Sequence, residues 1–128
     1  MSLPQSTGTW LDGRRRSFVY AFYGLKILFR EKNAQIHSAA AVIVVGAGFL
    51  LGVSRVDWLF LTGAITSVLV TEALNTALES IANAAVPEVH PLIKTGKDVA
   101  AGAVLLAAIG AACIGLLVFV PRIGQLFR

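Results

Sequence analysis

The stretch WLFLTGAITSVLVTEALNTALE, residues 58–79, decides the fold. Its first part, residues 58–71, carries no charge. As a helix at about 1.5 Å per residue this part would cover only about 21 Å of the roughly 30 Å hydrocarbon layer of a membrane. A helix that crosses the membrane here must therefore continue through Glu72, Asn75 and Glu79 before Pro87 ends it. This places Glu72 at membrane depth and Glu79 near the interface.

The composition of the whole chain also indicates an integral membrane protein. Of its 128 residues, 56% are hydrophobic and only 14% are charged, and the mean hydropathy is +0.76. Two more uncharged stretches, at 34–54 and at 99–120, each reach the length of about 20 residues that a helix needs to span a bilayer. The net charge of +4, concentrated near the N-terminus, suits a membrane surface better than nucleic acid. We predict an all-α membrane protein with three transmembrane helices, at about 34–54, 58–85 and 97–120.

A different pattern precedes the first span. Phe18, Phe22, Leu25 and Phe29 follow one another at spacings of 4, 3 and 4, which puts them on one helical face, and basic residues occupy another. This pattern predicts an N-terminal amphipathic surface helix over 14–31, with a soluble helix packed on a partner as the alternative. Residues 1–13 are expected to form a flexible tail and 123–128 a C-terminal tail, so that 14–122 make one membrane domain.

The distribution of Lys and Arg predicts the orientation. With the N-terminus inside, eight basic residues lie on the cytoplasmic side and three outside, which favours an N-in, C-out topology. The eight are Arg14, Arg15, Arg16, Lys26, Arg30, Lys32, Lys94 and Lys97, and the three are Arg55, Arg122 and Arg128.

Small residues recur every four positions within the spans. Gly48 and Gly52 form a GxxxG pair, and Ala107, Ala111 and Gly115 continue the same spacing in the third span. Such spacing permits close approach between helices. Since three helices bury little surface by themselves, we expect a homo-oligomer.

The acidic residues of the second span are the main candidates for chemistry, because charges at membrane depth are costly and usually functional. Glu72, Asn75 and Glu79 share one helical face, and the two glutamates lie about 10.5 Å apart along the axis. That separation is too long for both carboxylates to bind one Mg²⁺. We therefore expect different roles, with Glu72 as a general base for a membrane-embedded hydroxyl and Glu79 as a metal ligand.

Further polar residues are expected at the same cytoplasmic boundary. Glu31 could supply a second acidic metal ligand, and Lys97 with Asp98 opens the third span, where a lysine can neutralise phosphate charge. The site would suit a magnesium nucleotide and a lipid alcohol. Two alternatives remain on these residues alone: ion-pair contacts between helices, and the ion path of a small transporter. The segment around Lys97 lacks the glycine and hydroxyl residue of a Walker A motif.

Two motifs together resemble a known family. The run Glu72-Ala-Leu-Asn75-Thr-Ala-Leu-Glu79 is followed by Pro87-Glu88-Val89-His90-Pro91 and by Lys97-Asp98-Val-Ala-Ala-Gly-Ala-Val. Over about residues 14–120 the chain resembles the prokaryotic diacylglycerol kinase family, which includes undecaprenol kinases. The resemblance implies a homotrimer in the bacterial cytoplasmic membrane that transfers the γ-phosphate of ATP to a lipid alcohol with Mg²⁺, at the cytoplasmic interface.

The resemblance also implies roles for single residues. Glu72 would be the catalytic base, and Glu31 and Glu79 would hold the metal-bound nucleotide. Asn75 would support the site by hydrogen bonding. The residues implied to bind the nucleotide are Tyr20, Glu31, Glu79, Glu88, Val89, His90, Lys97 and Asp98.

One position departs from the family pattern, and one segment bears on the substrate. Asn83 stands where many members carry an aspartate, which removes a negative charge near the expected phosphates and affects a supporting position of the site. The segment from Glu31 through Asn33 to His37 resembles the Glu-x-Asn-x-x-x-His pattern of the undecaprenol kinase branch. Undecaprenol is therefore the expected substrate, with diacylglycerol as the alternative.

Overall fold

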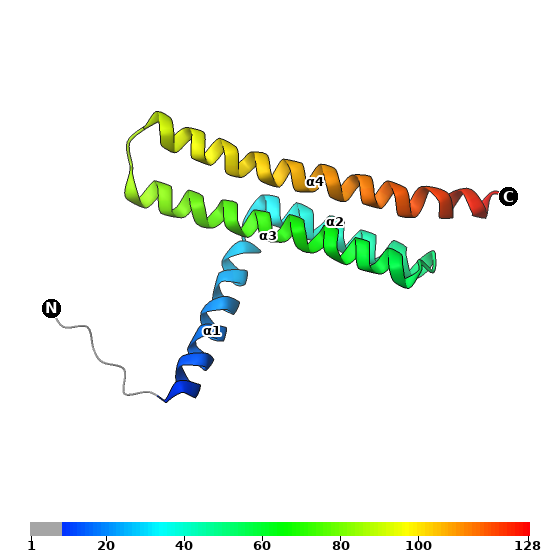
Figure 1. The fold of residues 1–128 in the computed structure, drawn as a ribbon, viewed down its shortest axis with the longest axis horizontal. Coiled ribbons are helices and arrows are strands. Elements are labelled where there is room, and N and C mark those ends of the chain that lie inside the picture. Colours follow the sequence, from blue (N-terminus) through cyan, green and yellow to red (C-terminus); the bar gives the residue numbers. More distant parts are fainter. Residues whose placement is uncertain (1–8) are drawn as a thin grey trace.

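The structure, a computed structural model, describes residues 9–128 and consists there of four α-helices (Figure 1). They are α1 (Trp10–Leu28), α2 (Lys32–Leu50), α3 (Arg55–Ala85) and α4 (Pro91–Leu126). The last three are long and apolar enough to cross a membrane. The prediction of an all-helical protein with three candidate spans is therefore confirmed.

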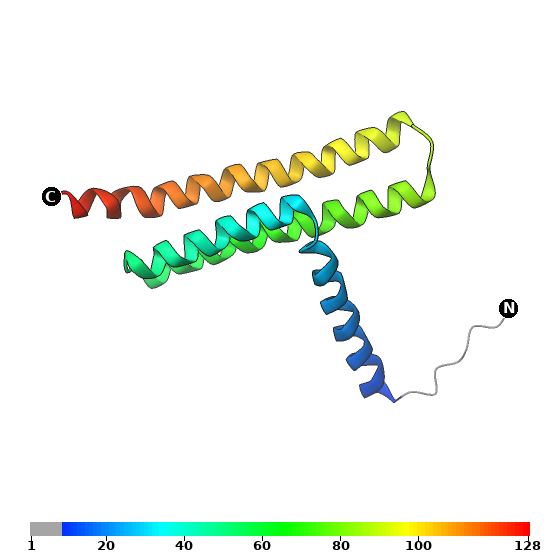
Figure 2. The ribbon, with the colours of Figure 1, turned by 180° about the vertical axis from the view of Figure 1, so that it is seen from behind.

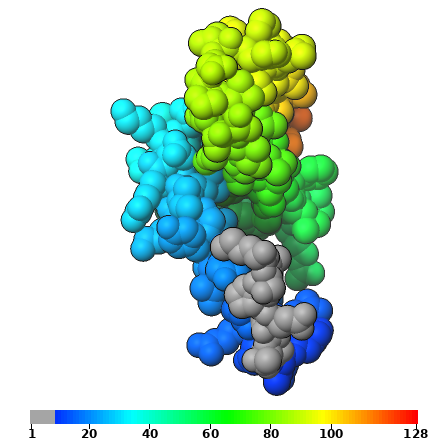
Figure 3. Space-filling view, turned by 90° about the vertical axis from the view of Figure 1, so that its left-hand side faces the viewer, coloured from blue at the N-terminus to red at the C-terminus, as the bar shows by residue number. Residues whose placement is uncertain are grey.

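The three candidate spans run side by side in alternating directions, and α3 contacts both α2 and α4 (Figures 1 and 2). The α1 helix leaves the start of α2 at a steep angle to this bundle. At the same end, α3 and α4 extend past the start of α2, and Figure 3 shows the tip of this α3–α4 hairpin in lime and yellow, set apart from α1 in blue. We call this the hairpin end, and the opposite end, with the α2–α3 turn, the turn end.

Two helices begin with reciprocal capping pairs that the sequence encodes locally. At the start of α3, the backbone N–H and the hydroxyl of Ser54 donate to Oδ2 of Asp57 at 2.9 and 2.8 Å, and the Asp57 N–H donates back to Ser54 Oγ at 3.1 Å. Thr9 and Asp12 form the equivalent pair at the start of α1. Each pair satisfies N–H groups that the first helical turn leaves free.

The observed helices are longer than several predicted segments. The α1 helix begins at Trp10, so residues 10–13 are helical rather than part of a tail, and residues 1–8 lie outside the described part of the chain. The same helix ends at Leu28, short of the predicted 31, because a turn separates it from α2. The Thr9–Asp12 capping pair explains the early start.

The α4 helix exceeds its predicted span at both ends. It starts at Pro91, whose missing N–H costs nothing at the first helical position, and His90 caps it by accepting the Leu92 N–H at Nδ1, 3.2 Å away. It then continues through Pro121 to Leu126, where a tail from residue 123 was expected. Pro121 removes one backbone donor from the inside of α4, yet the helix continues beyond it to Leu126.

A small apolar core lies at the turn end. Its buried members are Val53, Leu61 and Val118, and its half-buried members are Val44, Trp58, Ile114 and Phe119. Gly48 belongs to this packing, since a Cβ there would lie 2.6 Å from the Trp58 ring. Gly52 has a φ of +58° and lies in the turn after α2, so the expected GxxxG pair is not a continuous helix face. Gly48 instead allows the close contact with the Trp58 ring, and Gly52 forms the turn.

Most large apolar side chains of the spans point outwards. Leu50, Phe49 and Leu117 are 88%, 75% and 77% exposed. In water such a surface would be unstable, whereas in a bilayer it faces hydrocarbon, and the backbone hydrogen bonds of the helix interior are made within each helix. The exposed surface therefore agrees with membrane embedding.

Candidate functional site

The site centres on Glu72, whose side chain is buried between helices although it carries a carboxylate. Only 2% of Glu72 is exposed. On α2, Nδ1 of His37 lies at hydrogen-bond distance, 2.7 Å, from Oε1 of Glu72. The carboxylate thus has a specific partner within a helix that is long and apolar enough to cross a membrane, which is the usual condition for a charged group in such a segment.

The predicted polar face of α3 continues from Glu72 towards the hairpin end. Asn75 lies about one turn further along, and its Oδ1 is buried with no hydrogen-bond partner among the described residues. Glu79 follows at about 10.5 Å from Glu72 along the axis and is half-buried. A buried amide oxygen without a partner is costly, so Asn75 is a group ready to accept a hydrogen bond or a cation.

Beyond Glu79, the two helices of the hairpin are joined by a polar contact. Lys97 on α4 donates from Nζ to Oδ1 of Asn83 on α3 at 3.1 Å. Since Asn83 is neutral, it binds the ammonium group without cancelling its charge. Asp98 instead forms an exposed pair with Lys94, one turn earlier on α4. The lysine expected to meet phosphate thus keeps its positive charge at the hairpin end.

The loop between α3 and α4 carries the predicted segment Glu88, Val89 and His90. All three residues are exposed, with Val89 at 97%. One ring nitrogen of His90, Nδ1, already accepts a hydrogen bond, because it caps α4. The loop therefore offers these side chains to solvent beside Lys97 rather than to the bundle.

Glu31 and Tyr20 lie outside the bundle. Glu31 precedes α2 as its N-cap residue and is exposed. Along α2, Glu31 lies about 9 Å before His37, and along α3, Glu79 lies about 10.5 Å beyond Glu72. Because α2 and α3 are antiparallel and His37 contacts Glu72, Glu31 and Glu79 lie at a similar height in the bundle. Tyr20 is 69% exposed on α1. Because α1 points away from the bundle, the structure does not bring Tyr20 to the other predicted nucleotide residues (Figure 1).

Within residues 9–128, no three His, Cys, Asp or Glu side chains gather closely enough to hold a metal ion by themselves. This donor set still fits Mg²⁺, which is commonly bound through one or two carboxylates together with substrate phosphates and water. Glu31 and Glu79, at a similar height and partly or fully accessible, have the oxygen chemistry that Mg²⁺ prefers.

A groove of about 240 Å³ runs between α2, α3 and α4, next to the Glu72 site. His37 is its polar lining residue, and Glu72 is not part of the lining. The rest of the lining is apolar and dominated by small side chains: Ala40, Ala41, Val44, Leu61, Ala64, Ile65, Val68, Leu69, Ala108, Ala111, Ala112 and Gly115. The apolar lining of the groove suits a hydrocarbon chain.

His37 is a residue whose partner the sequence interpretation does not identify. A lone histidine near the interface is expected to form hydrogen bonds rather than to bind a metal, and the structure shows that its partner is Glu72. A signal was present, because the short turn at 51–54 makes α2 and α3 antiparallel neighbours. The distance along α2 from this turn to His37 is similar to the distance along α3 from the same turn to Glu72. The mismatch is about one helical turn, so the two side chains lie at a similar depth.

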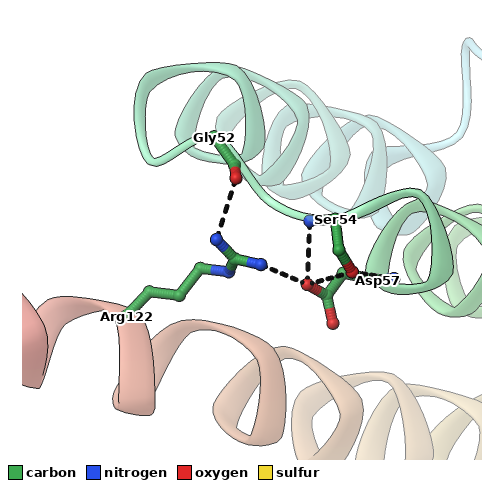
Figure 4. A network of polar contacts seen from close by, with 4 residues as sticks. All are labelled: Gly52, Ser54, Asp57 and Arg122. Atoms are coloured by element: carbon green, nitrogen blue, oxygen red, sulfur yellow. Dashed lines mark hydrogen bonds and ion pairs between the residues drawn. The ribbon is translucent and has the colours of Figure 1, made fainter.

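The turn end carries a second polar network, shown in Figure 4. Arg122 on α4 donates to the Gly52 carbonyl at 2.8 Å and to Oδ2 of Asp57 at 2.7 Å. Asp57 is in turn held by the N–H and hydroxyl of Ser54. The network joins α4 to the α2–α3 turn, and it lies at the opposite end of α3 from Glu79.

Comparison with known proteins identifies the family. The family model described as prokaryotic diacylglycerol kinase matches residues 19–119, which is most of the chain and includes Glu72, Glu79 and Lys97. The chain belongs to the prokaryotic diacylglycerol kinase family. Membership confirms the resemblance seen in the sequence, and it makes the protein a membrane lipid kinase, for which ATP is the implied phosphate donor.

Curated relatives carry two different substrate names. An undecaprenol kinase of Bacillus subtilis is 40% identical over 84% of this chain and 89% of its own length. A diacylglycerol kinase of Synechocystis is 40% identical over 82% of this chain and 61% of its own. A diacylglycerol kinase of Haemophilus influenzae is 28% identical over 69% of this chain and 75% of its own. Within the prokaryotic diacylglycerol kinase family, identity alone therefore does not select the lipid.

Proposed function

We propose that this kinase transfers the γ-phosphate of ATP to undecaprenol, with Mg²⁺, at the cytoplasmic face of a bacterial inner membrane. The observation that carries the proposal is Glu72, a buried carboxylate inside a candidate span that is held by His37 at the head of an apolar groove. A proton acceptor at that place can reach a hydroxyl whose hydrocarbon chain stays in the bilayer.

In the proposed reaction Glu72 is the terminal acceptor of the hydroxyl proton. The lipid oxygen forms a bond to the γ-phosphorus, the bond from that phosphorus to the bridging oxygen breaks, and ADP leaves with the electron pair. The proton lost by the hydroxyl ends on the Glu72 carboxylate. Positioning and charge stabilisation supply most of the catalysis in phosphoryl transfer, so the remaining residues act mainly on the phosphates.

The nucleotide would lie along the hairpin end. Glu31 and Glu79 would hold Mg²⁺, which when bound offsets negative charge on the phosphates. Lys97 would meet the same phosphates, and its charge is available because its partner Asn83 is neutral. Asn75 would offer its unpartnered Oδ1 to the site. The exposed loop residues Glu88, Val89 and His90, with Asp98, would line the nucleotide from the aqueous side.

The proposed assembly is a homotrimer with an N-in, C-out topology. The eight-to-three distribution of basic residues supports this orientation, and it turns the hairpin end towards cytoplasmic ATP. The amphipathic α1 would lie on the membrane surface, in keeping with its steep angle to the bundle (Figure 2). A trimer would also let α1 of one subunit bring Tyr20 to the site of another, which a single chain does not achieve.

Undecaprenol is preferred over diacylglycerol because of the groove and the relatives. The groove lining offers no polar side chain beyond His37, so it has no donors for the ester carbonyls of a diacylglycerol. The undecaprenol kinase relative also aligns over 89% of its length. Diacylglycerol stays as a second candidate, since the Synechocystis relative is equally identical.

The test is phosphate transfer from γ-labelled ATP by the purified protein in lipid bilayers. Undecaprenol and diacylglycerol are supplied in parallel, and the lipid products are separated. We expect label on undecaprenol, abolished by chelation of Mg²⁺. Label mainly on diacylglycerol would replace the substrate while keeping the mechanism, and no label on any lipid alcohol, together with ATP-independent ion flux, would contradict a kinase.

A further inference from the structure

The groove and the buried carboxylate are connected by one side chain. His37 lines the groove and is hydrogen-bonded through Nδ1 to Glu72, whereas Glu72 does not line the groove and is only 2% exposed. His37 itself retains 27% exposure. A hydroxyl at the head of the groove therefore meets the imidazole before it meets the carboxylate.

The state of the imidazole follows from this hydrogen bond. In the proposed role as a base, Glu72 starts the reaction ionised and can only accept, so Nδ1 would carry the proton of the 2.7 Å contact. In a neutral histidine the other nitrogen, Nε2, is then an acceptor. The same arrangement, a buried carboxylate that fixes the tautomer of a histidine, orients the general base in serine hydrolases.

We propose that His37 is a catalytic residue, which relays the proton of the lipid hydroxyl to Glu72. As the lipid oxygen bonds to the γ-phosphorus, its proton passes to Nε2 of His37, and the Nδ1 proton passes to Oε1 of Glu72. The imidazole stays neutral throughout, and the net result is a protonated Glu72. The inference rests on the proposed kinase reaction, and it adds the group that touches the alcohol.

The relay also explains why a histidine suits this position. A buried base that formed a charged imidazolium in an apolar groove would suffer a desolvation cost. A transfer through both ring nitrogens leaves no new charge on His37, and places the proton on a carboxylate that is already buried. Asparagine or glutamine could hold Glu72 by a hydrogen bond, but neither can accept and release a proton.

The decisive experiment compares His37→Asn with the wild-type kinase. The Asn amide nitrogen is bonded to Cγ, as Nδ1 is, so this variant can keep the hydrogen bond to Glu72 while it removes Nε2. We expect kcat to fall by about 10²–10⁴-fold, the usual contribution of general base catalysis, with the KM for ATP nearly unchanged. A kcat for His37→Asn within about threefold of the wild type would show that His37 only positions Glu72 and would overturn the relay.

Two further variants keep the test sharp if asparagine perturbs the fold. Ser38→Ala is the matched control, because the Ser38 hydroxyl bonds only to the Ala34 carbonyl within α2 and should leave kcat unchanged. In His37→Ala, added imidazole should restore activity in a concentration-dependent way. Activity of His37→Ala that is insensitive to imidazole would count against the relay. If the wild type itself labels no lipid in the same assay, it is the proposed function that fails.

Discussion

The two ends of the bundle differ in how their polar groups are satisfied. At the turn end, Arg122 donates hydrogen bonds to the Gly52 carbonyl and to the Asp57 carboxylate, and Ser54 also donates to that carboxylate (Figure 4). Towards the hairpin end, Asn75 has a buried oxygen without a partner among the described residues. One end is a closed network, whereas the other holds groups that a ligand can still satisfy.

This difference indicates that the turn end holds the helices together, whereas the groups proposed to react lie towards the hairpin end. The apolar core and the tight Gly48–Trp58 contact also lie at the turn end, so that end fixes the helices relative to one another. The hairpin end is thereby free to carry polar groups that the proposed nucleotide and lipid would satisfy. Variants at the two ends should therefore fail in different ways.

The largest expected effect is on turnover, from Glu72→Gln. Gln keeps a similar shape and can still contact His37, but it cannot accept a proton, so kcat should fall by about 10²–10⁴-fold. Thermal stability in detergent and ATP binding should be retained. Full activity of this variant would remove Glu72 as the base and weaken the contrast between the two ends.

A smaller effect is expected from Glu79→Gln, about tenfold. Loss of one carboxylate ligand should raise the Mg²⁺ concentration needed for half-maximal activity, because a neutral amide binds Mg²⁺ less well. The measurement is activity against Mg²⁺ at fixed ATP. An unchanged Mg²⁺ dependence would contradict the ligand role of Glu79.

At the turn end, Arg122→Ala should lower stability rather than turnover. It leaves Asp57 and the Gly52 carbonyl without their partner, so we expect a lower melting temperature with kcat per folded molecule unchanged. Thermal unfolding in detergent measures it, with Arg128→Ala, at the end of the chain, as the control. A large fall in kcat per folded molecule would show that the two ends are not independent.

Gly48→Ala tests the packing at the same end with a matched control on the same helix. The new Cβ would lie 2.6 Å from the Trp58 ring, so the ring must shift, at a cost of about 1 kcal/mol or more. At Gly46 nothing lies within 4 Å of an added Cβ, and Gly46→Ala should be neutral or slightly stabilising. Equal melting temperatures for the two variants would contradict the packing described here.

The smallest expected effect concerns Asn83→Asp. The added carboxylate would pair with Lys97 and stand near the proposed phosphates, where the position is exposed. An exposed pair is worth less than about 1 kcal/mol, so we expect a two- to threefold decrease in the Mg²⁺ requirement. Asn83→Ala removes the hydrogen bond without adding charge, and the same decrease in that variant would rule out a charge effect.

The lengths of the uncharged segments predicted the fold, together with one segment that is too short to cross a membrane by itself. Uncharged runs gave the three spans, and the shortness of residues 58–71 forced Glu72 into the membrane region of α3. Helix ends were less predictable, because the Thr9–Asp12 cap and the continuation through Pro121 depend on local hydrogen bonds that periodicity does not report.

The polar face of α3 could be predicted from the sequence, but its contacts with other helices could not. Spacing puts Glu72, Asn75 and Glu79 on one face from sequence alone. The contacts of His37 with Glu72 and of Arg122 with Asp57 join residues 35 and 65 positions apart, so they require the packing register of neighbouring helices. A register of this kind is set by side-chain packing, which a single sequence encodes only indirectly.

The burial of Glu72, near the middle of the 31-residue α3, has a consequence for how the substrate is supplied. Drawing a lipid into water costs about 0.8 kcal/mol per methylene, or about 16 kcal/mol for roughly 20 of them. The proposed base at bilayer depth would avoid this extraction, because the alcohol could arrive by sideways diffusion within its own leaflet. The rate should then follow the mole fraction of the lipid in the surface, and dilution with inert lipid should slow the enzyme even when bulk concentrations are held constant.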